Sequence, residues 1–236
     1  MSRRRGIFVV GTDTEVGKTV FCAAVVAALR QDGRDAGYCK PVSSDGVAHG
    51  GRLVSPDALL VAEATGLDDP PELLNPVCLP HPLSPLAAAR RAGTGVDLAA
   101  ALAGARACVA AHDFTVVEGV GGLLVPLTDD HTLRELVRES TLPAVVVGRP
   151  NLGTINHTLL TIEALRAAGV PVRAFAFSGP RPQAAGDPAL ESNAALIQEF
   201  SGAPFAGRLP WLDQAPSARS LAAAAESLDL ALLTAG

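Results

Sequence analysis

The chain has 236 residues, of which 48% are hydrophobic and 4% aromatic. A chain of this size can bury about 70–75% of its unfolded surface, so we expect one domain over residues 1–236 around an aliphatic core. The formal net charge of −5 argues against a protein that binds nucleic acid through its phosphates. The arginines at positions 3–5 are therefore interpreted as a solvated chain end.

The sequence also indicates a compartment. Near the start only residues 7–10 are continuously apolar, too few for a secretory signal, and no run approaches the roughly 18 apolar residues that span a membrane. The cysteines at positions 22, 39, 78 and 108 form no Cys-x-x-Cys pair, which argues against a zinc site or a disulfide framework. We expect a cytoplasmic protein with reduced thiols and no membrane partner.

Strand-like apolar runs alternate along the chain with helical runs rich in alanine and leucine. Strands are predicted at residues 7–10, 36–40, 114–118, 144–148, 172–177 and 205–209; helices are predicted at 18–31, 57–65, 97–111, 132–139, 156–168 and 191–200, followed by an alanine-rich final helix. This alternation predicts a three-layer, doubly wound α/β fold, with a mostly parallel sheet covered by helices on both faces. In such folds ligands bind beyond the carboxyl ends of the strands.

The turn after the first strand carries a phosphate-binding motif. Residues 11–19 read Gly-Thr-Asp-Thr-Glu-Val-Gly-Lys-Thr and lead from a strand into a helix, whose free N–H groups and macrodipole attract anions. Lys18 supplies a cation for the outer phosphates, and Thr19 a hydroxyl for the accompanying magnesium. Thr12 stands where the usual motif has glycine, so this is a variant P-loop. It predicts a nucleoside triphosphate with Mg²⁺ as the ligand.

Two further strands end on ionisable residues that would face the P-loop. Lys40 ends the second predicted strand, and Glu118 ends the strand before a Gly-Val-Gly-Gly turn. Glu118 is predicted to reach magnesium directly or through water; the alternative is a helix cap or a surface carboxylate. Lys40 is a candidate catalytic cation, or else a solvated loop lysine. Asp57 opens a helix, where it either caps the helix or contributes to the magnesium site.

Taken together, the motifs resemble the dethiobiotin synthetase family over about residues 7–211. The resemblance rests on the P-loop, on Lys-Pro-Val-Ser-Ser at 40–44, on Asp57, on Glu-Gly-Val-Gly-Gly at 118–122 and on Leu-Gly-Thr-Ile-Asn-His at 152–157. It implies a P-loop NTPase fold and a homodimer with the site at its interface. The implied substrates are 7,8-diaminononanoate, CO2 and MgATP, and the products are dethiobiotin, ADP and phosphate.

The resemblance also implies a role for each matching residue. Lys18, Lys40 and Thr14 would act on the phosphates and a carbamate, Thr19, Asp57 and Glu118 would hold magnesium, and Ser44 would bind the diamine. The diamine carboxylate would be received by Gly153, Thr154, Ile155 and Asn156 from across the dimer interface; without the resemblance, Asn156 is a plain helix cap. The nucleotide would be held by Glu15, Val16, Gly17, Lys18, Thr19, Val20, Asp57, Glu118, Gly119, Val120, Gly121, Ser178, Gly179, Pro210, Trp211 and Leu212.

One segment departs from the family pattern. Where family members commonly have Asn-Asp or a similar pair that reads adenine, this chain has Phe-Ser-Gly-Pro at residues 177–180. A serine offers fewer hydrogen-bonding groups than an asparagine amide. The hypothesis is a relaxed base preference, with discrimination moved to backbone groups near Pro210, Trp211 and Leu212.

Two other functions use related motifs. The synthetase half of a corrinoid amidating enzyme is usually joined to a glutaminase, and this chain is too short for both and has no convincing cysteine nucleophile. A partitioning or septum-positioning ATPase usually has an extra lysine early in its P-loop, where Asp13 and Thr14 stand here, and a basic or amphipathic terminus. Both are therefore weaker interpretations.

Overall fold

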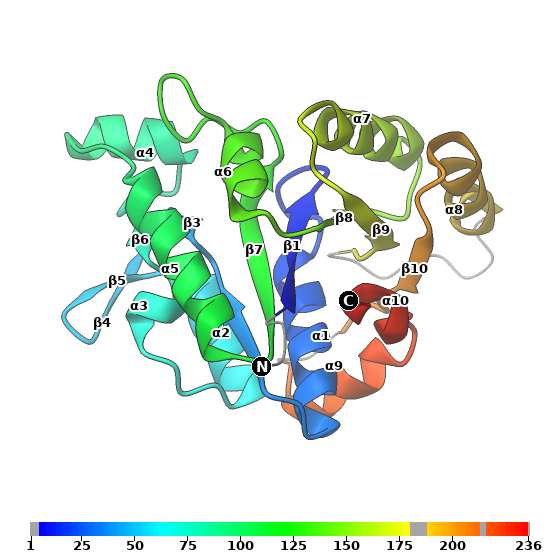
Figure 1. Ribbon diagram of the computed structural model, residues 1–236, viewed down its shortest axis with the longest axis horizontal. Coiled ribbons are helices and arrows are strands. Elements are labelled where there is room, and N and C mark those ends of the chain that lie inside the picture. The colour runs from blue at the N-terminus through cyan, green and yellow to red at the C-terminus, as the bar shows by residue number, and fades with distance from the viewer. Residues whose placement is uncertain (1–4, 180–187, 213–215, 236) are drawn as a thin grey trace.

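The computed structural model describes residues 5–179, 188–212 and 216–235. Arg3 and Arg4 of the terminal arginine cluster, and Pro180, lie outside these ranges. Within them the central sheet has six parallel strands in the order β10-β9-β8-β1-β7-β2 (Figure 1). Their bounds are β1 (Arg5–Gly11), β2 (Ala36–Cys39), β7 (Phe114–Gly122), β8 (Ala144–Gly148), β9 (Val172–Phe177) and β10 (Phe205–Arg208).

Helices cover both faces of this sheet. One face packs against α1 (Lys18–Gln31), α2 (Pro56–Thr65), α9 (Ala218–Ala225) and α10 (Leu230–Thr234). The other packs against α4 (Pro85–Ala92), α5 (Leu98–Ala111), α6 (Leu133–Ser140), α7 (Thr154–Ala167) and α8 (Pro188–Ser201). The predicted three-layer α/β fold is confirmed.

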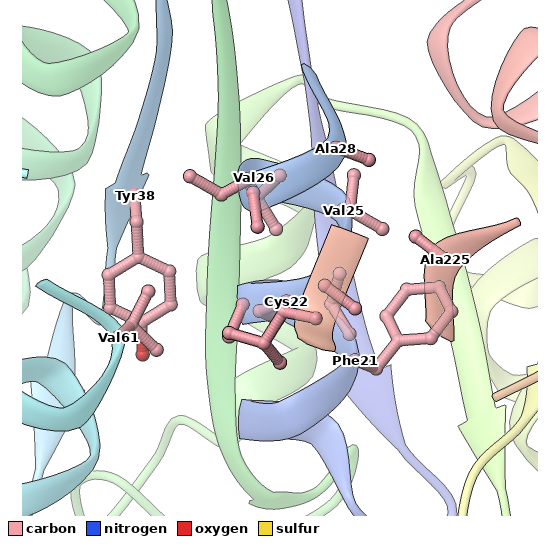
Figure 2. Packing of buried hydrophobic residues seen from close by; sticks show 14 of the residues in the cluster. Phe21, Cys22, Val25, Val26, Ala28, Tyr38, Val61 and Ala225 are labelled. Carbon is pink, nitrogen blue, oxygen red and sulfur yellow. The ribbon is translucent and has the colours of Figure 1, made fainter. Parts of the chain in front are cut away.

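Strand alternation divides the core into two clusters. In β1, Ile7 and Val9 face the α1 side, whereas Phe8 and Val10 face the α5 side. Successive side chains of a strand point to opposite faces, so a strand buried on both sides must be apolar throughout. Figure 2 shows the α1 side, where Phe21 and Cys22 lie in the layer that also contains Tyr38.

Several short elements have no counterpart in the sequence prediction. They are β3 (Val42–Ser43), which pairs with β6 (Val77–Cys78), the hairpin β4 (Val47–His49) and β5 (Arg52–Val54), and the helices α3 (Pro71–Leu74), α4 and α10. Strands of two or three residues and helices of four or five are too short to show a hydrophobic period, and α4 has only eight residues. Predicted bounds also differ at the ends: β2 stops at Cys39 rather than at residue 40, and α7 begins at Thr154 rather than at residue 156.

The sequence predicted neither a membrane-spanning segment nor a disulfide framework. None of the helices in the described ranges is long and apolar enough to cross a membrane. All four cysteines fall within the described ranges and are free thiols.

Candidate active site

A cavity of about 470 Å³ opens at the carboxyl edge of the sheet, between the P-loop, the ends of β2, β7 and β9, and the start of α2. This is the edge at which doubly wound folds bind ligands. Most of the residues predicted for the site line it, namely Thr14, Glu15, Gly17, Lys18, Thr19, Val20, Lys40, Ser44, Asp57, Glu118, Val120, Gly121, Ser178, Gly179, Pro210, Trp211 and Leu212. Ser43 and Pro216 also line it, and sequence reasoning missed both.

Six predicted residues do not line this cavity. Val16 is buried under the P-loop with 1% exposure, and Gly119 faces Leu133 and Phe8 in the core. The other four form the first turn of α7: Gly153 is its N-cap with φ 93°, and Gly153 and Thr154 border a separate cavity of about 90 Å³. Asn156 is exposed inside the helix, so its interpretation as the cap was wrong.

Glycines shape the P-loop. Gly17 is the N-cap of α1 with φ 86°, a backbone conformation that favours glycine, and a side chain there would collide with Ser178. A Cβ at Gly11 would collide with the ammonium of Lys18. The loop therefore folds close enough for the Lys18 ammonium to donate to the carbonyl of Asp13 at 3.0 Å. Lys18 is only 7% exposed, and burial lowers its pKa below the usual lysine value.

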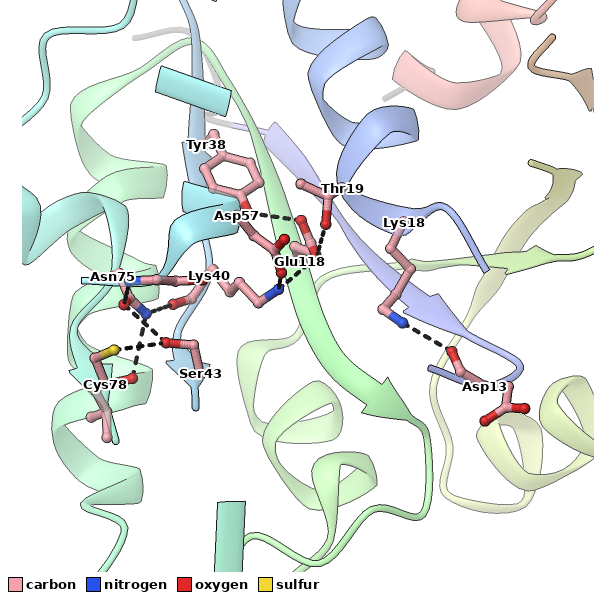
Figure 3. A network of polar contacts seen from close by, with 12 residues as sticks. Asp13, Lys18, Thr19, Tyr38, Lys40, Ser43, Asp57, Asn75, Cys78 and Glu118 are labelled. Atoms are coloured by element: carbon pink, nitrogen blue, oxygen red, sulfur yellow. Dashed lines mark hydrogen bonds and ion pairs between the residues drawn. The ribbon is translucent and has the colours of Figure 1, made fainter. Parts of the chain in front are cut away.

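Lys40 lies at the centre of a buried ion cluster (Figure 3). Its ammonium donates to Glu118 Oε1 at 2.9 Å and to the carboxylate of Asp57. Lys40 is 5% exposed and Glu118 is fully buried, so the interpretations of a solvated lysine and of a surface or capping glutamate were wrong. Burial alone would lower the pKa of Lys40, but the two carboxylates outweigh it and raise the pKa above the usual lysine value.

Asp57 does not cap its helix. Ser55 is the N-cap of α2 and Pro56 occupies the first turn, so Asp57 follows the cap and its side chain turns to Lys40. The capping interpretation was wrong because the cap is Ser55, two residues before the aspartate, and the helix already begins at Pro56.

Asn75 fixes the backbone around this cluster, and no sequence signal pointed to it. It is fully buried; its amide donates to the carbonyl of Lys40 at 2.6 Å, and its oxygen accepts from the Ser55 N–H at 2.8 Å and the Ser43 hydroxyl at 3.0 Å. One side chain thus joins the end of β2 to the start of α2. This holds Lys40 and Asp57 at a fixed separation.

The oxygen donors in the cavity fit a magnesium ion that accompanies a nucleotide. The Thr19 hydroxyl donates to Glu118 Oε1 at 2.9 Å. The ammonium of Lys40 donates to the carboxylates of both Glu118 and Asp57, which brings the two carboxylates close together. Mg²⁺ prefers one or two carboxylates completed by phosphates and water. The described residues contain no group of three or more His, Cys, Asp or Glu suited to a metal, so this donor set fits Mg²⁺ only with phosphate oxygens added.

At the far side of the cavity Ser178 follows β9. Its hydroxyl donates to the carbonyl of Gly17 at 3.3 Å, and the residue is 3% exposed. This contact is with the P-loop backbone. It leaves the hydroxyl oxygen free to accept a hydrogen bond.

Solved structures share this fold at low sequence identity. A ParA family ATPase from Chlorobium tepidum TLS aligns with a TM-score of 0.55 at 13% identity, covering 99% of this chain and 97% of that one. The MinC:MinD cell division protein complex of Aquifex aeolicus aligns with a TM-score of 0.55 at 11% identity, covering 94% of each chain. These matches show the P-loop NTPase fold alone.

Sequence comparison gives the family. A family model described as "AAA domain" matches residues 5–219. The ATP-dependent dethiobiotin synthetase BioD of Anaeromyxobacter dehalogenans (strain 2CP-C) is 44% identical over 218 residues, which are 92% of this chain and 95% of the relative. The ATP-dependent dethiobiotin synthetase BioD of Thermodesulfovibrio yellowstonii is 34% identical over 218 residues, which are 89% of this chain and 90% of the relative. The chain belongs to the dethiobiotin synthetase family.

Membership in the dethiobiotin synthetase family confirms the resemblance inferred from the motifs. The relatives match over nearly their whole length and are named dethiobiotin synthetases, so the comparisons give no support to a corrinoid amidating enzyme. The likeness to ParA and MinD extends only to the fold, so it adds nothing to the interpretation as a partitioning switch.

Proposed function

We propose that the protein is an ATP-dependent dethiobiotin synthetase, which closes the ureido ring of dethiobiotin from 7,8-diaminononanoate, CO2 and ATP. The names of its relatives supply the reaction. The observation that carries the proposal is the buried cluster of Lys40, Asp57 and Glu118 beside the P-loop in one cavity. A nucleotide site alone would need no second buried lysine.

The proposed reaction suits a site with two buried cations. One amine of the diamine attacks CO2 and loses a proton, giving a carbamate. A carbamate oxygen then attacks the γ-phosphorus and releases ADP, and the second amine attacks the carbonyl carbon of the mixed anhydride, expels phosphate and closes the ring. At an effective dielectric near 20, a cation about 4 Å from a unit negative charge contributes roughly 4 kcal/mol before desolvation.

The chain's residues divide this work. Lys18 would stabilise the outer phosphates and Lys40 the carbamate, with Thr14 and Glu15 around them and Ser44 toward the diamine. Magnesium, when bound, would neutralise phosphate charge, and Thr19, Asp57 and Glu118 are the residues proposed to hold it. The same two carboxylates pair with Lys40 in the free chain, so the proposal requires the ammonium of Lys40 to turn from them toward the substrate.

We also propose a homodimer. Gly153, Thr154, Ile155 and Asn156 lie outside the main cavity of their own chain. The Thr154 N–H donates to the carbonyl of Asn151 at 3.2 Å, but the first turn of a helix leaves further N–H groups without intrahelical partners, and these suit a carboxylate. Support comes from exposed leucines beside this turn: Leu152 is 91% exposed, Leu124 56% and Leu160 55%. The diamine carboxylate would bind to α7 of the second copy. Four free thiols are compatible with the proposed cytoplasmic location.

Base preference is the open part of the nucleotide site. We propose that it is relaxed. The Ser178 hydroxyl already donates its one hydrogen bond to the carbonyl of Gly17, and its side chain has no second polar group to donate to a base. Pro210, Trp211 and Leu212 would flank the base. An ATP specificity above a hundredfold over CTP and GTP would contradict this proposal.

The deciding experiment is product formation by the purified protein. The protein would receive 7,8-diaminononanoate, bicarbonate, Mg²⁺ and each of ATP, CTP and GTP in turn, with dethiobiotin identified by mass. We expect dethiobiotin in a one-to-one ratio with released phosphate. Phosphate release that does not depend on the diamine, without dethiobiotin from any triphosphate, would instead favour the switch or a related ligase.

A further inference from the structure

The carboxylate of Glu118 receives three hydrogen bonds although it is fully buried. Oε1 accepts from the Thr19 hydroxyl and from the Lys40 ammonium, each at 2.9 Å. Oε2 accepts from the Tyr38 hydroxyl at 2.7 Å. Figure 3 shows Tyr38 approaching the carboxylate from the side away from Lys18.

The two carboxylate oxygens therefore have different neighbours. Thr19 and Lys40, the partners of Oε1, line the cavity, whereas Tyr38 does not. Tyr38 is fully buried on β2 in the layer that contains Cys22 and Val61 (Figure 2). A ligand in the cavity can displace the partners of Oε1, but it cannot reach the phenol.

The phenol is held as a hydrogen-bond donor. A phenol hydroxyl has one proton and can donate one hydrogen bond. Its one acceptor among the described residues is Glu118 Oε2.

We propose that Tyr38 is a positioning residue for Glu118, which reserves Oε2 and thereby presents Oε1 alone to a magnesium ion in the cavity. The torsion that rotates a carboxylate has broad minima, so a carboxylate without this restraint can turn either oxygen to the ion. Residues that orient a metal ligand commonly change metal affinity 10–100-fold when substituted. This inference rests on the metal role given to Glu118 in the proposed function.

The first test substitutes Tyr38→Phe, which removes only the hydroxyl. We expect the affinity for Mg²⁺, titrated calorimetrically into protein saturated with ADP, to weaken by about tenfold or more. The affinity for ADP in a metal chelator should change less than about twofold. Thr115→Val is the matched control, since it removes a buried hydroxyl from β7 that donates to Cys108 rather than to Glu118.

The second test uses the native protein and so does not depend on the variant folding. Tyr38 is the chain's one tyrosine. Tyrosine labelled with ¹³C at Cζ therefore gives one NMR signal. We expect this signal to shift when Mg²⁺ is added to the ADP complex. The midpoint of the shift should fall at the same Mg²⁺ concentration as the midpoint of the calorimetric titration. A tyrosine that only fills the core would not respond to the ion in this way.

The outcomes separate this inference from the function on which it rests. If the native ADP complex binds Mg²⁺, but Tyr38→Phe binds it equally well and the labelled signal does not move, Tyr38 has no positioning role and the synthetase proposal stands. If the native ADP complex binds no Mg²⁺, the metal role of Glu118 fails and this inference fails with it. Equal weakening in Thr115→Val would also overturn it, because the loss would then follow from removal of any buried hydroxyl.

Discussion

Lys18 and Lys40 are both buried in one cavity, yet their surroundings act on them in opposite ways. The ammonium of Lys40 contacts two carboxylates, whereas Lys18 contacts a backbone carbonyl. The pKa of Lys40 is therefore raised and that of Lys18 lowered by burial. In the free chain the ammonium of Lys40 is paired with carboxylates, whereas that of Lys18 has only a carbonyl partner.

Replacement of Lys40 by alanine tests its place in the reaction. Removing one preorganised donor to a developing anion typically costs about 10²–10³ in turnover, so we expect kcat to fall by about 10² or more. Nucleotide binding should change little, and the fluorescence of Trp211, the chain's one tryptophan and a cavity residue, gives a direct readout. Near-normal kcat in a variant that still binds nucleotide would show that Lys40 takes no part in the reaction.

Replacement of Lys18 by methionine tests the cost of its burial. The folded-state pKa of Lys18 lies below that of the unfolded chain, so the unfolded chain binds more protons between the two values and native stability rises with pH across that window. Methionine removes this penalty, which is largest at and below the lowered pKa. We expect Tm at neutral pH to be unchanged or higher, and turnover to fall by about 10² or more.

The contrast with Lys40 supplies the control for this prediction. Its folded-state pKa is raised, so its contribution to stability is fully present below the unfolded lysine value and is lost only as pH rises through the folded value. Lys40→Met should therefore lower Tm at neutral pH. If Lys18→Met lowered Tm as much as Lys40→Met, the charge of Lys18 would stabilise the folded protein, and the prediction would be wrong.

The residues that line the cavity were largely predictable from the sequence, whereas the residues that hold them in place were not. Lys40 and Glu118 were predicted because ionisable residues at the ends of apolar strands are conspicuous. Asn75 lies 35 residues from Lys40 in the chain, in a segment without periodic pattern, so nothing local marks it. Tyr38 did leave a signal: it precedes Lys40 by two positions, and alternate residues of a strand share a face.

At the scale of elements, caps decide where helices begin. Helix α6 has a capping box in which the Thr132 N–H and hydroxyl donate to Glu135 Oε2 at 2.8 and 2.7 Å. Burial alone would raise the pKa of Glu135, but these hydrogen bonds outweigh it and lower the pKa to about 2. The stability from this carboxylate is therefore present above the ordinary glutamate value and is lost as pH falls from about 4.5 toward 2.

Glu135→Gln should show this pH dependence. At pH 7 we expect the free energy of unfolding in urea to fall by about 1 kcal/mol, and the difference from the native protein to vanish as pH approaches 2. Glu139→Gln, on the same helix but outside the cap, serves as control and should stay within about 0.5 kcal/mol at both pH values. A deficit in Glu135→Gln that persists at low pH would mean that packing, not charge, is responsible.

The regular elements were predictable and the irregular ones were not, for a physical reason. A strand buried on both faces, such as β8, reads as an unbroken apolar run, and α1 and α5 are long enough to show a helical pattern. The segment between β2 and α5 holds short strands and proline-started helices. Its course depends on distant partners, such as the contact of Asn75 with the start of α2.

At the scale of the whole molecule, exposed leucines gather on one surface, beside the start of α7. Leu124 and Leu160 border a cavity of about 390 Å³ that shares Thr12, Asp13 and His157 with the smaller cavity at the start of α7. Leu152 lies at that smaller cavity. In the proposed dimer, one closed two-fold contact would bury these exposed apolar side chains in both chains.

Leu160→Glu should separate association from nucleotide binding. In the proposed two-fold dimer the new carboxylate would lie on both sides of the contact, so we expect the dimer dissociation constant, measured by sedimentation equilibrium, to rise by about 100-fold or more. Dethiobiotin formation should fall in parallel at low protein concentration, while the Trp211 fluorescence response to nucleotide stays. Leu60→Glu places the same charge on α2, where Leu60 is 37% exposed, and should leave the dimer intact. A native chain that sediments as a monomer and still forms dethiobiotin would contradict the shared site, because each chain would then bind the diamine carboxylate within itself.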